Sequence, residues 1–222
     1  MRTPVKICGI TRSEDAALAA RLGAAWVGFV FWPGSPRFVE PVAAEEILAG
    51  LPPHVVGVGV FVDQAVEEVN AIAARVGLGA VQLHGDESAV ACARCTQRVI
   101  KAVRLSPETT MEVVDTVWSP ATVLVDTFDA VRIGGTGRVV DWTLAARIAR
   151  RRRTFLSGGL RAENVGDALR RVAPYALDVS SGVEALPGIK DAERMRAFFE
   201  AVSAATRQAE PVSGAATGGA QA

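Results

Sequence analysis

Short apolar segments alternate with longer amphipathic segments along almost the whole chain. The apolar segments have the length of buried strands, and each is followed by a stretch in which Ala, Arg, Glu and apolar residues recur with helical spacing. The last such stretch, IKDAERMRAFFEAVSAA, predicts a helix over 189–205. This alternation is typical of βαβ units rather than of hairpins. Eight segments are predicted as strands: VKICG at 5–9, WVGFVF at 26–31, VVGVGVF at 55–61, AVQLH at 80–84, RVIKAV at 98–103, TVLVD at 122–126, TFLS at 154–157 and ALDVS at 176–180.

Eight strand–helix pairs in this length predict an α/β fold, a (β/α)8 TIM barrel, whose typical size is about 250 residues or somewhat less. An open doubly wound sheet is the second choice, because it usually has fewer strands. We expect a single catalytic domain over residues 1–205. Residues 206–222 are small and polar without periodicity, so we expect a disordered tail there.

Composition narrows the class of ligand. Lys plus Arg and Asp plus Glu each total 24, so the net charge is zero, which argues against nucleic acid or a membrane surface as partner and favours a small molecule. No signal peptide or membrane-spanning apolar run is evident, so a cytoplasmic location is expected. Three cysteines give no disulfide framework, and two separated histidines predict no metal site.

Polar residues near the carboxyl ends of the predicted strands are the candidates for chemistry, because active sites of such barrels lie at that end. Along VKICG, alternation places Lys6 and Cys8 on one face, toward the barrel axis. Asp126 ends the sixth strand, and His84 ends the fourth. A cation, a thiol, an imidazole and a carboxylate are therefore expected to meet at one mouth.

Simpler explanations exist for these residues taken singly. A cysteine near a strand end is more often a small apolar residue than a base, and a strand-end aspartate often caps the next helix. The combination favours chemistry, because Lys6 lies close to Cys8 in sequence and a nearby cation promotes the thiolate.

Glycine-rich loops follow the last three predicted strands: GGTG at 134–137, SGGL at 157–160 and SSGVE at 180–184. Glycines let backbone N–H groups approach an anion, and the seventh and eighth loops of such barrels frequently bind phosphate. No nucleotide motif is present. Arg37, in the SPR motif after the second strand, can bind a carboxylate with two hydrogen bonds, although a solvated loop arginine is the commoner case.

These motifs together resemble one enzyme family, the phosphoribosylanthranilate isomerases of tryptophan biosynthesis. The similarity extends from Lys6 to about Phe199. It rests on KICGIT at 6–11, SPR at 35–37, VGVGVF at 56–61, VQLHGDE at 81–87, Asp126, GGTG with DW at 141–142, SGGL with Asn164 and Val165, and DVSSGVE with PGIKD.

The resemblance implies an Amadori rearrangement of N-(5-phosphoribosyl)anthranilate to 1-(2-carboxyphenylamino)-1-deoxyribulose 5-phosphate, without cofactor or metal. It implies that Asp126 is the general acid, that Cys8 is the general base, and that Arg37 holds the anthranilate carboxylate. Lys6 either promotes the thiolate or pairs with an interior carboxylate such as Asp178. His84 is expected to be a wall or orienting residue.

The resemblance also implies that backbone N–H groups of the glycine-rich loops hold the substrate phosphate. The residues expected there are Gly135, Gly158, Gly159, Ser181 and Gly182. A monomer or a homodimer is expected.

Two other functions fit parts of the pattern. Isomerases of histidine biosynthesis perform the same rearrangement on an aminoimidazole carboxamide ribonucleotide, but their relatives have an aspartate at the end of strand one, where this chain has Cys8. A non-catalytic barrel that binds sugar phosphates would keep the glycine loops, yet it would need no facing acid and base.

Overall fold

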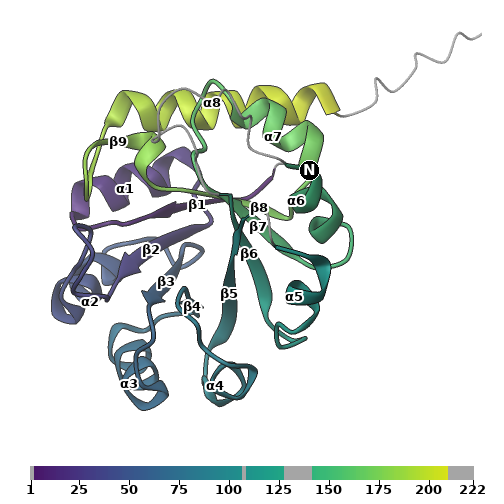
Figure 1. The fold of residues 1–222 in the computed structure, drawn as a ribbon. Helices are drawn as coiled ribbons and strands as arrows, with labels where there is room; N and C mark the ends of the chain where they lie inside the picture. The colour runs from purple at the N-terminus through teal and green to yellow at the C-terminus, as the bar shows by residue number, and fades with distance from the viewer. Residues whose placement is uncertain (1–2, 107–108, 128–141, 210–222) are drawn as a thin grey trace, which may run out of the picture.

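The computed structural model describes residues 3–106, 109–127 and 142–209 of the 222-residue chain. Eight parallel strands, β1 to β8, close into a barrel in which β1 pairs with β8 (Figure 1). This confirms the predicted (β/α)8 architecture. These strands are β1 (Val5–Cys8), β2 (Trp26–Val30), β3 (Val56–Phe61), β4 (Ala80–Leu83), β5 (Arg98–Leu105), β6 (Thr122–Thr127), β7 (Thr154–Ser157) and β8 (Ala176–Val179).

The helices surround the barrel (Figure 1). They are α1 (Ser13–Leu22), α2 (Pro41–Ala49), α3 (Val66–Val76), α4 (Ala89–Arg94), α5 (Met111–Asp115), α6 (Trp142–Ala149), α7 (Val165–Val172) and α8 (Ala192–Ala209). Helix α8 runs past the boundary expected after residue 205, and residues 210–222 lie outside the described residues. Within the described ranges, no helix is both long and apolar enough to cross a membrane.

The strand side chains alternate between two apolar layers. Outward-facing residues such as Ile7 and Phe29 are fully buried against the helices. Inward-facing residues such as Val58, Leu124 and Phe155 fill the barrel itself. The barrel is therefore a packed core, which leaves its ends as the places where a ligand can bind.

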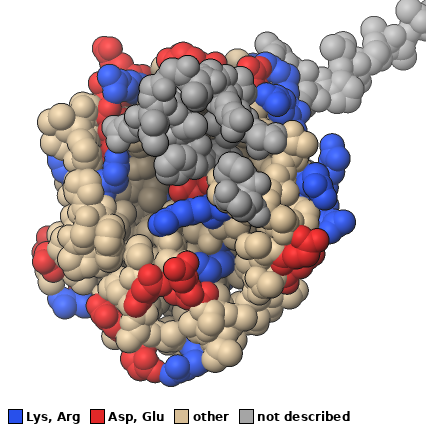
Figure 2. Space-filling model, in the orientation of Figure 1, with Lys and Arg blue, Asp and Glu red and all other residues tan. Residues whose placement is uncertain are grey.

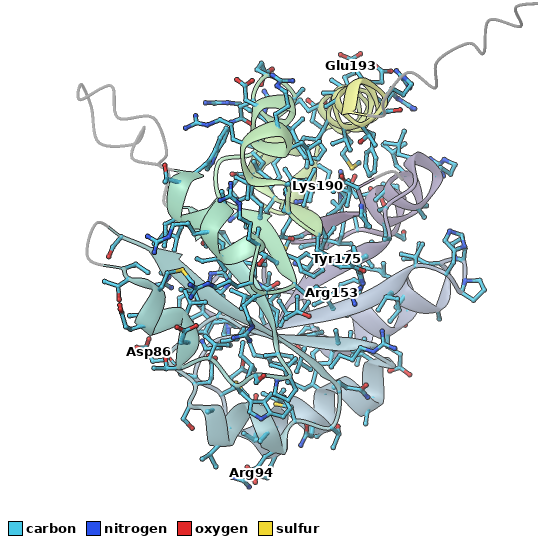
Figure 3. The ribbon with its side chains drawn as sticks, turned by 90° about the vertical axis from the view of Figure 1, so that its right-hand side faces the viewer. Asp86, Arg94, Arg153, Tyr175, Lys190 and Glu193 are labelled. Atoms are coloured by element: carbon cyan, nitrogen blue, oxygen red, sulfur yellow. The ribbon has the colours of Figure 1, made fainter. Side chains whose placement is uncertain are left out.

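Aromatic and cationic side chains occupy the amino-terminal end of the barrel. Trp26 packs edge-on against Phe155, with ring centroids 4.9 Å apart. The guanidinium of Arg153 lies 3.6 Å from the ring centroid of Tyr175 (Figure 3). Cys8 and Asp126 lie at the other end of the barrel, at or near the carboxyl ends of β1 and β6.

The segment between β8 and α8 differs from the expected simple loop and helix. A 3₁₀ turn, Ser181–Val183, leads into a two-stranded hairpin of β9 (Glu184–Leu186) and β10 (Ile189–Lys190). Helix α8 starts only after Asp191, whose side chain accepts hydrogen bonds from the backbone N–H groups of Glu193 and Arg194. This side-chain cap explains why the helix does not begin at Ile189 as predicted.

Candidate active site

Strand β1 carries both Lys6 and Cys8 on its inward face, as the alternation predicted. The register pairs Lys6 with Asp178 of β8 and Cys8 with Gly28 of β2. A Cβ at position 28 would lie 2.9 Å from the Cys8 Sγ and 3.0 Å from the Lys6 Nζ. The thiol and the ammonium therefore share the space over Gly28, and only glycine leaves that space open.

The ammonium of Lys6 is fully buried and has two polar partners. Its Nζ lies 2.8 Å from the Asp178 Oδ1 and 2.9 Å from the Gln82 Oε1. Burial lowers the pKa of Lys6, but Asp178 and Cys8 together outweigh this effect, and the pKa is raised above its ordinary value. Of the two roles left open for Lys6, pairing with Asp178 is therefore found in the structure.

Cys8 lies at the rim and is 8% exposed. Burial raises the pKa of its thiol, and the nearby Asp178 carboxylate adds to this rise. The ammonium groups of Lys6 and Lys190 oppose the rise without cancelling it. Lys6 therefore favours the thiolate as expected, but it does not make Cys8 an ionised thiol at neutral pH in this environment.

Asp126, at the end of β6, faces the same mouth. Its Oδ2 lies 3.4 Å from the Nε2 of His84, and its side chain is 31% exposed. The other ring nitrogen of His84, Nδ1, lies 2.8 Å from the Nε2 of Gln82. His84 therefore lies between Gln82 and Asp126, the candidate acid. This position fits the orienting role expected for His84.

Arg37 is anchored by a carboxylate of the chain itself. Its Nε donates to Glu184 at 2.9 Å and 3.2 Å, and its Nη2 donates at 2.6 Å. Glu184 also accepts from the buried Nζ of Lys190 at 2.7 Å, and this Nζ donates to the Cys8 carbonyl at 2.5 Å. Gly9 has φ 74°, and a Cβ there would lie 2.6 Å from the Arg37 Cδ. The arginine stem therefore crosses directly over the end of β1.

Burial and neighbouring charges have opposite effects on the pKa values of Glu184 and Lys190. Burial raises the pKa of Glu184, but hydrogen bonds from Arg37 and Lys190 more than offset it, so the pKa lies below its ordinary value. Burial lowers the pKa of Lys190 despite the attraction of Glu184. Glu184 is consequently a fixed negative charge, and it holds Arg37 in one orientation.

The glycine-rich loops after β7 and β8 approach each other closely. Gly158 and Gly159 have φ 89° and 61°, the left-handed region that favours glycine. A Cβ at Gly182 would lie 1.8 Å from the backbone carbonyl oxygen of Leu160. Gly182 and Ser181 belong to the 3₁₀ turn after β8, so the two loops lie in direct contact. Gly135, the fifth expected phosphate contact, lies outside the described residues.

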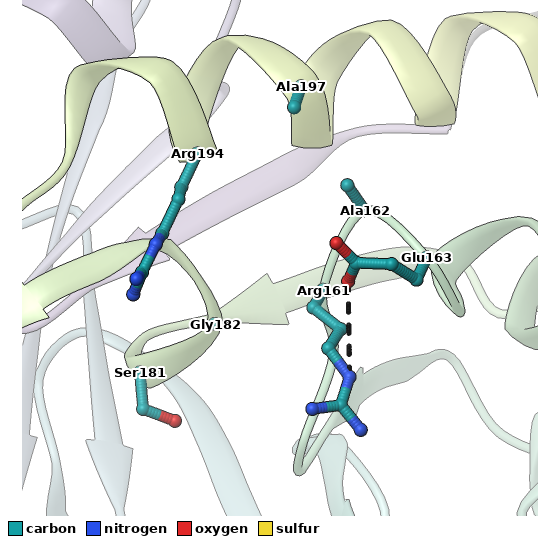
Figure 4. Close-up of a pocket in the computed structure, with 7 residues that line it drawn as sticks. All are labelled: Arg161, Ala162, Glu163, Ser181, Gly182, Arg194 and Ala197. Carbon is teal, nitrogen blue, oxygen red and sulfur yellow. Dashed lines mark ion pairs between the residues drawn. The ribbon is translucent and has the colours of Figure 1, made fainter.

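A pocket opens beside these loops, against the start of α8 (Figure 4). Ser181 and Gly182 line one wall, and the side chains of Arg161 and Arg194 extend along it. The Nε of Arg161 lies 4.0 Å from the Oε2 of Glu163. The Nη1 of Arg194 donates to the backbone carbonyl oxygen of Glu184. The pocket is therefore bordered by two guanidinium groups.

Charges of both signs are interspersed over the face in Figure 2, in keeping with the zero net charge. No group of three or more His, Cys, Asp or Glu side chains suited to a metal ion occurs among the residues that the structure describes.

Sequence reasoning did not select three residues that the structure brings into the site: Gln82, Glu184 and Lys190. Gln82 had a detectable signal, because it lies two residues before His84 and shares its face of the strand predicted over 80–84. Glu184 had a weaker one, as the last residue of the SSGVE motif. Lys190 had none, because its segment was predicted as the start of a helix.

Comparison with known proteins places the chain in a family. Residues 5–201 match the family model for N-(5'-phosphoribosyl)anthranilate (PRA) isomerase. The N-(5'-phosphoribosyl)anthranilate isomerase of Pelobacter propionicus is 46% identical over 195 residues, which cover 88% of this chain and 93% of the relative. The corresponding enzyme of Herminiimonas arsenicoxydans is 44% identical over 217 residues, 92% and 94% of the two chains. The chain belongs to the phosphoribosylanthranilate isomerase family.

Solved structures agree with this assignment. The crystal structure of phosphoribosyl anthranilate isomerase from Thermotoga maritima superimposes with a TM-score of 0.84 at 43% identity, over 91% of this chain and 99% of that one. A second such structure, in complex with reduced 1-(o-carboxyphenylamino)-1-deoxyribulose 5-phosphate, has a TM-score of 0.82 at 42% identity, over 91% and 99% of the chains. The chain is therefore an isomerase of tryptophan biosynthesis with a small-molecule substrate.

Proposed function

We propose that this phosphoribosylanthranilate isomerase rearranges N-(5-phosphoribosyl)anthranilate by general acid–base catalysis, with Cys8 as the base and Asp126 as the acid. The observation that carries the proposal is their placement: Cys8 ends β1 and Asp126 lies near the end of β6, on the inward face of one barrel mouth. The proposed mechanism uses no cofactor or metal, because each bond rearrangement in it is driven by a proton transfer to or from the substrate.

In the proposed sequence, Asp126 first donates a proton to the ring oxygen of the ribose. The bond between that oxygen and C1 breaks, and the nitrogen lone pair forms the C1–N double bond of a Schiff base. In the fraction of enzyme molecules in which Cys8 is ionised, its thiolate then takes the proton from C2, and the electrons of the C–H bond form the enolamine. Tautomerisation of the enolamine gives the ketose.

The two ends of the substrate are held by different groups in this proposal. Arg37 uses its Nε and Nη2 edge for Glu184, which leaves the Nη1 and Nη2 edge for the anthranilate carboxylate. The backbone N–H groups of Gly158, Gly159, Ser181 and Gly182 bind the phosphate. Fixing both ends keeps C1 and C2 between acid and base, which supplies the entropic part of the rate enhancement.

The test follows the fluorescence of phosphoribosylanthranilate after addition of the purified protein. Decay at a rate proportional to enzyme concentration is expected. The aminoimidazole carboxamide ribonucleotide of histidine biosynthesis serves as the comparison substrate, and preference for it would overturn the proposal. A soluble chain that fails to rescue a tryptophan auxotroph lacking this isomerase would instead favour a non-catalytic sugar-phosphate-binding barrel.

We also propose that the protein acts in the cytoplasm, as a monomer or a homodimer. Its place in amino-acid biosynthesis supports the first part. For the second, one solved relative, the enzyme of Thermotoga maritima, is dimeric, and monomers have been generated from it. Light scattering at micromolar concentration distinguishes the two states.

A further inference from the structure

A line of polar contacts crosses the barrel from β8 to β6. It begins with Asp178, passes through Lys6 and Gln82 to His84, and ends at Asp126. The first three of these residues are at least nine-tenths buried, with exposed fractions of 5%, 0% and 1% for the whole residue. Buried polar groups must satisfy one another in the absence of water, so each contact constrains the next.

The chemistry of Lys6 fixes the orientation of Gln82. An ammonium carries only donors, so the atom of Gln82 that lies 2.9 Å from the Lys6 Nζ must be the carbonyl oxygen. The carboxamide nitrogen then faces the Nδ1 of His84 at 2.8 Å. An N–H group can only donate, so this Nδ1 must accept and carries no proton.

A neutral imidazole that accepts at Nδ1 carries its proton on Nε2. That nitrogen lies 3.4 Å from the Asp126 Oδ2, a separation of the kind that shortens when substrate is bound. His84 is therefore arranged to donate to one carboxyl oxygen of Asp126. The acidic proton of Asp126 belongs on the other oxygen, Oδ1.

We propose that Gln82 is a positioning residue for this isomerase: it holds His84 in the Nε2–H tautomer, so that His84 donates to Oδ2 of Asp126 and directs the acidic proton of Asp126 to Oδ1. The inference rests on the proposed role of Asp126 as the acid. After that proton has been given to the ring oxygen, the same N–H group stabilises the carboxylate that remains. His84 therefore contributes more in the transition state than in the ground state, and its loss affects kcat rather than KM.

The tautomer is read directly from nitrogen NMR of the imidazole. His54 is the only other histidine and lies exposed in the loop between α2 and β3, so His54→Asn gives a protein in which all imidazole signals belong to His84. We expect a protonated Nε2 and an unprotonated Nδ1 at neutral pH. In the Gln82→Met variant, which keeps the side-chain volume but lacks the donor, the Nδ1–H form is expected to gain population.

Kinetics test the same proposal through a double-mutant cycle. Gln82→Met is expected to lower kcat about ten-fold with little change in KM, the effect of one weakened charge-assisted hydrogen bond. Because Gln82 acts through His84, the same substitution in a His84→Phe background should change kcat less than two-fold. A merely structural role for Gln82 would reduce kcat in both backgrounds alike.

Three results would overturn the inference: a parent protein with the proton of His84 on Nδ1, one with both nitrogens protonated, or equal effects of Gln82→Met in the two backgrounds. Absence of isomerase activity in the parent chain overturns the proposed function instead. The nitrogen spectrum needs no substrate, so it decides the tautomer in either case, even if the Gln82 variant fails to fold.

Discussion

The ammonium of Lys6 lies 2.8 Å from the carboxylate of Asp178, across the seam where β1 and β8 close the barrel. Both side chains are buried, with exposed fractions of 0% and 6%. A buried ion pair contributes little net stability relative to an apolar pair, because both charges lose their hydration. Removal of one partner is nevertheless costly, because the other charge is then left uncompensated.

Lys6→Met is therefore expected to lower the free energy of unfolding by about 3–5 kcal/mol. In the double variant Lys6→Met, Asp178→Asn, which removes both charges of the pair, most of this loss should be recovered. Urea denaturation of the parent, both single variants and the double variant measures the coupling. If the losses of the single variants simply add in the double variant, Lys6 and Asp178 are not energetically coupled, and the prediction is wrong.

The fold could be predicted from the sequence because its signal is local and repeated. Each strand is a short apolar run, and the boundaries of β7 came out as predicted at 154–157. The β9–β10 hairpin was missed, because its two strands are only three and two residues long and are defined by their pairing rather than by periodicity. Helix α8 was predicted to start too early, since the cap at Asp191 can be recognised only once the hairpin before it is known.

The site was predictable to the extent that it follows from alternation along a strand. Lys6, Cys8 and Asp126 were located in this way, because residues two apart share a face. The Arg37–Glu184 pair was not predictable, since its partners are 147 residues apart in sequence. The pair joins one positive and one negative charge, so it leaves the net charge unchanged and cannot be inferred from composition. One edge of the Arg37 guanidinium is bound to Glu184, and the two-hydrogen-bond contact expected with a ligand carboxylate is left to the other edge.

Cys8→Ala is expected to lower kcat by a factor of about 10² or more, because it removes the base while leaving the barrel intact. Steady-state kinetics with phosphoribosylanthranilate, together with circular dichroism, measures the effect. Cys92→Ala is the matched control: this cysteine is buried in α4, and its loss should leave kcat unchanged. A Cys8→Ala enzyme that works near the parent rate would show that another group takes the C2 proton.

The raised pKa of Cys8 gives a second prediction about the base. A thiol whose pKa is raised becomes a thiolate only above the ordinary range for cysteine. Ultraviolet absorbance of the thiolate in a Cys92→Ala, Cys95→Ala background should therefore appear at alkaline pH. Lys6→Met removes a cation that opposes the rise, so the transition should move to still higher pH. Ionisation in the neutral range, or a shift toward lower pH in the Lys6 variant, would contradict the assigned electrostatics.

Glu184→Gln should loosen Arg37, because the neutral amide cannot hold the guanidinium as the carboxylate does. KM is expected to rise about ten-fold with a smaller change in kcat, as measured in the fluorescence assay.

The depressed pKa of Glu184 adds a stability test. Its contribution is present above the pKa of the unfolded chain and is lost as pH falls through the lower folded pKa. The variant should therefore lose less stability than the parent between neutral and acidic pH, and equal acid sensitivity would argue against this role.

Gly182→Ala tests the contact between the two loops proposed to bind phosphate. The added Cβ would lie 1.8 Å from the backbone carbonyl oxygen of Leu160, so the loops must separate. We expect a loss of about 3 kcal/mol in the free energy of unfolding, which corresponds to a fall of about 6–12 °C in Tm. We also expect weaker inhibition by inorganic phosphate.

Gly166→Ala in α7 is the matched control, because its Cβ would meet only the flexible end of Arg170 at 3.4 Å and the Cβ of Ala205 at 3.8 Å. That variant should stay within about 1 kcal/mol of the parent. Unchanged phosphate inhibition in Gly182→Ala would place the phosphate away from these loops.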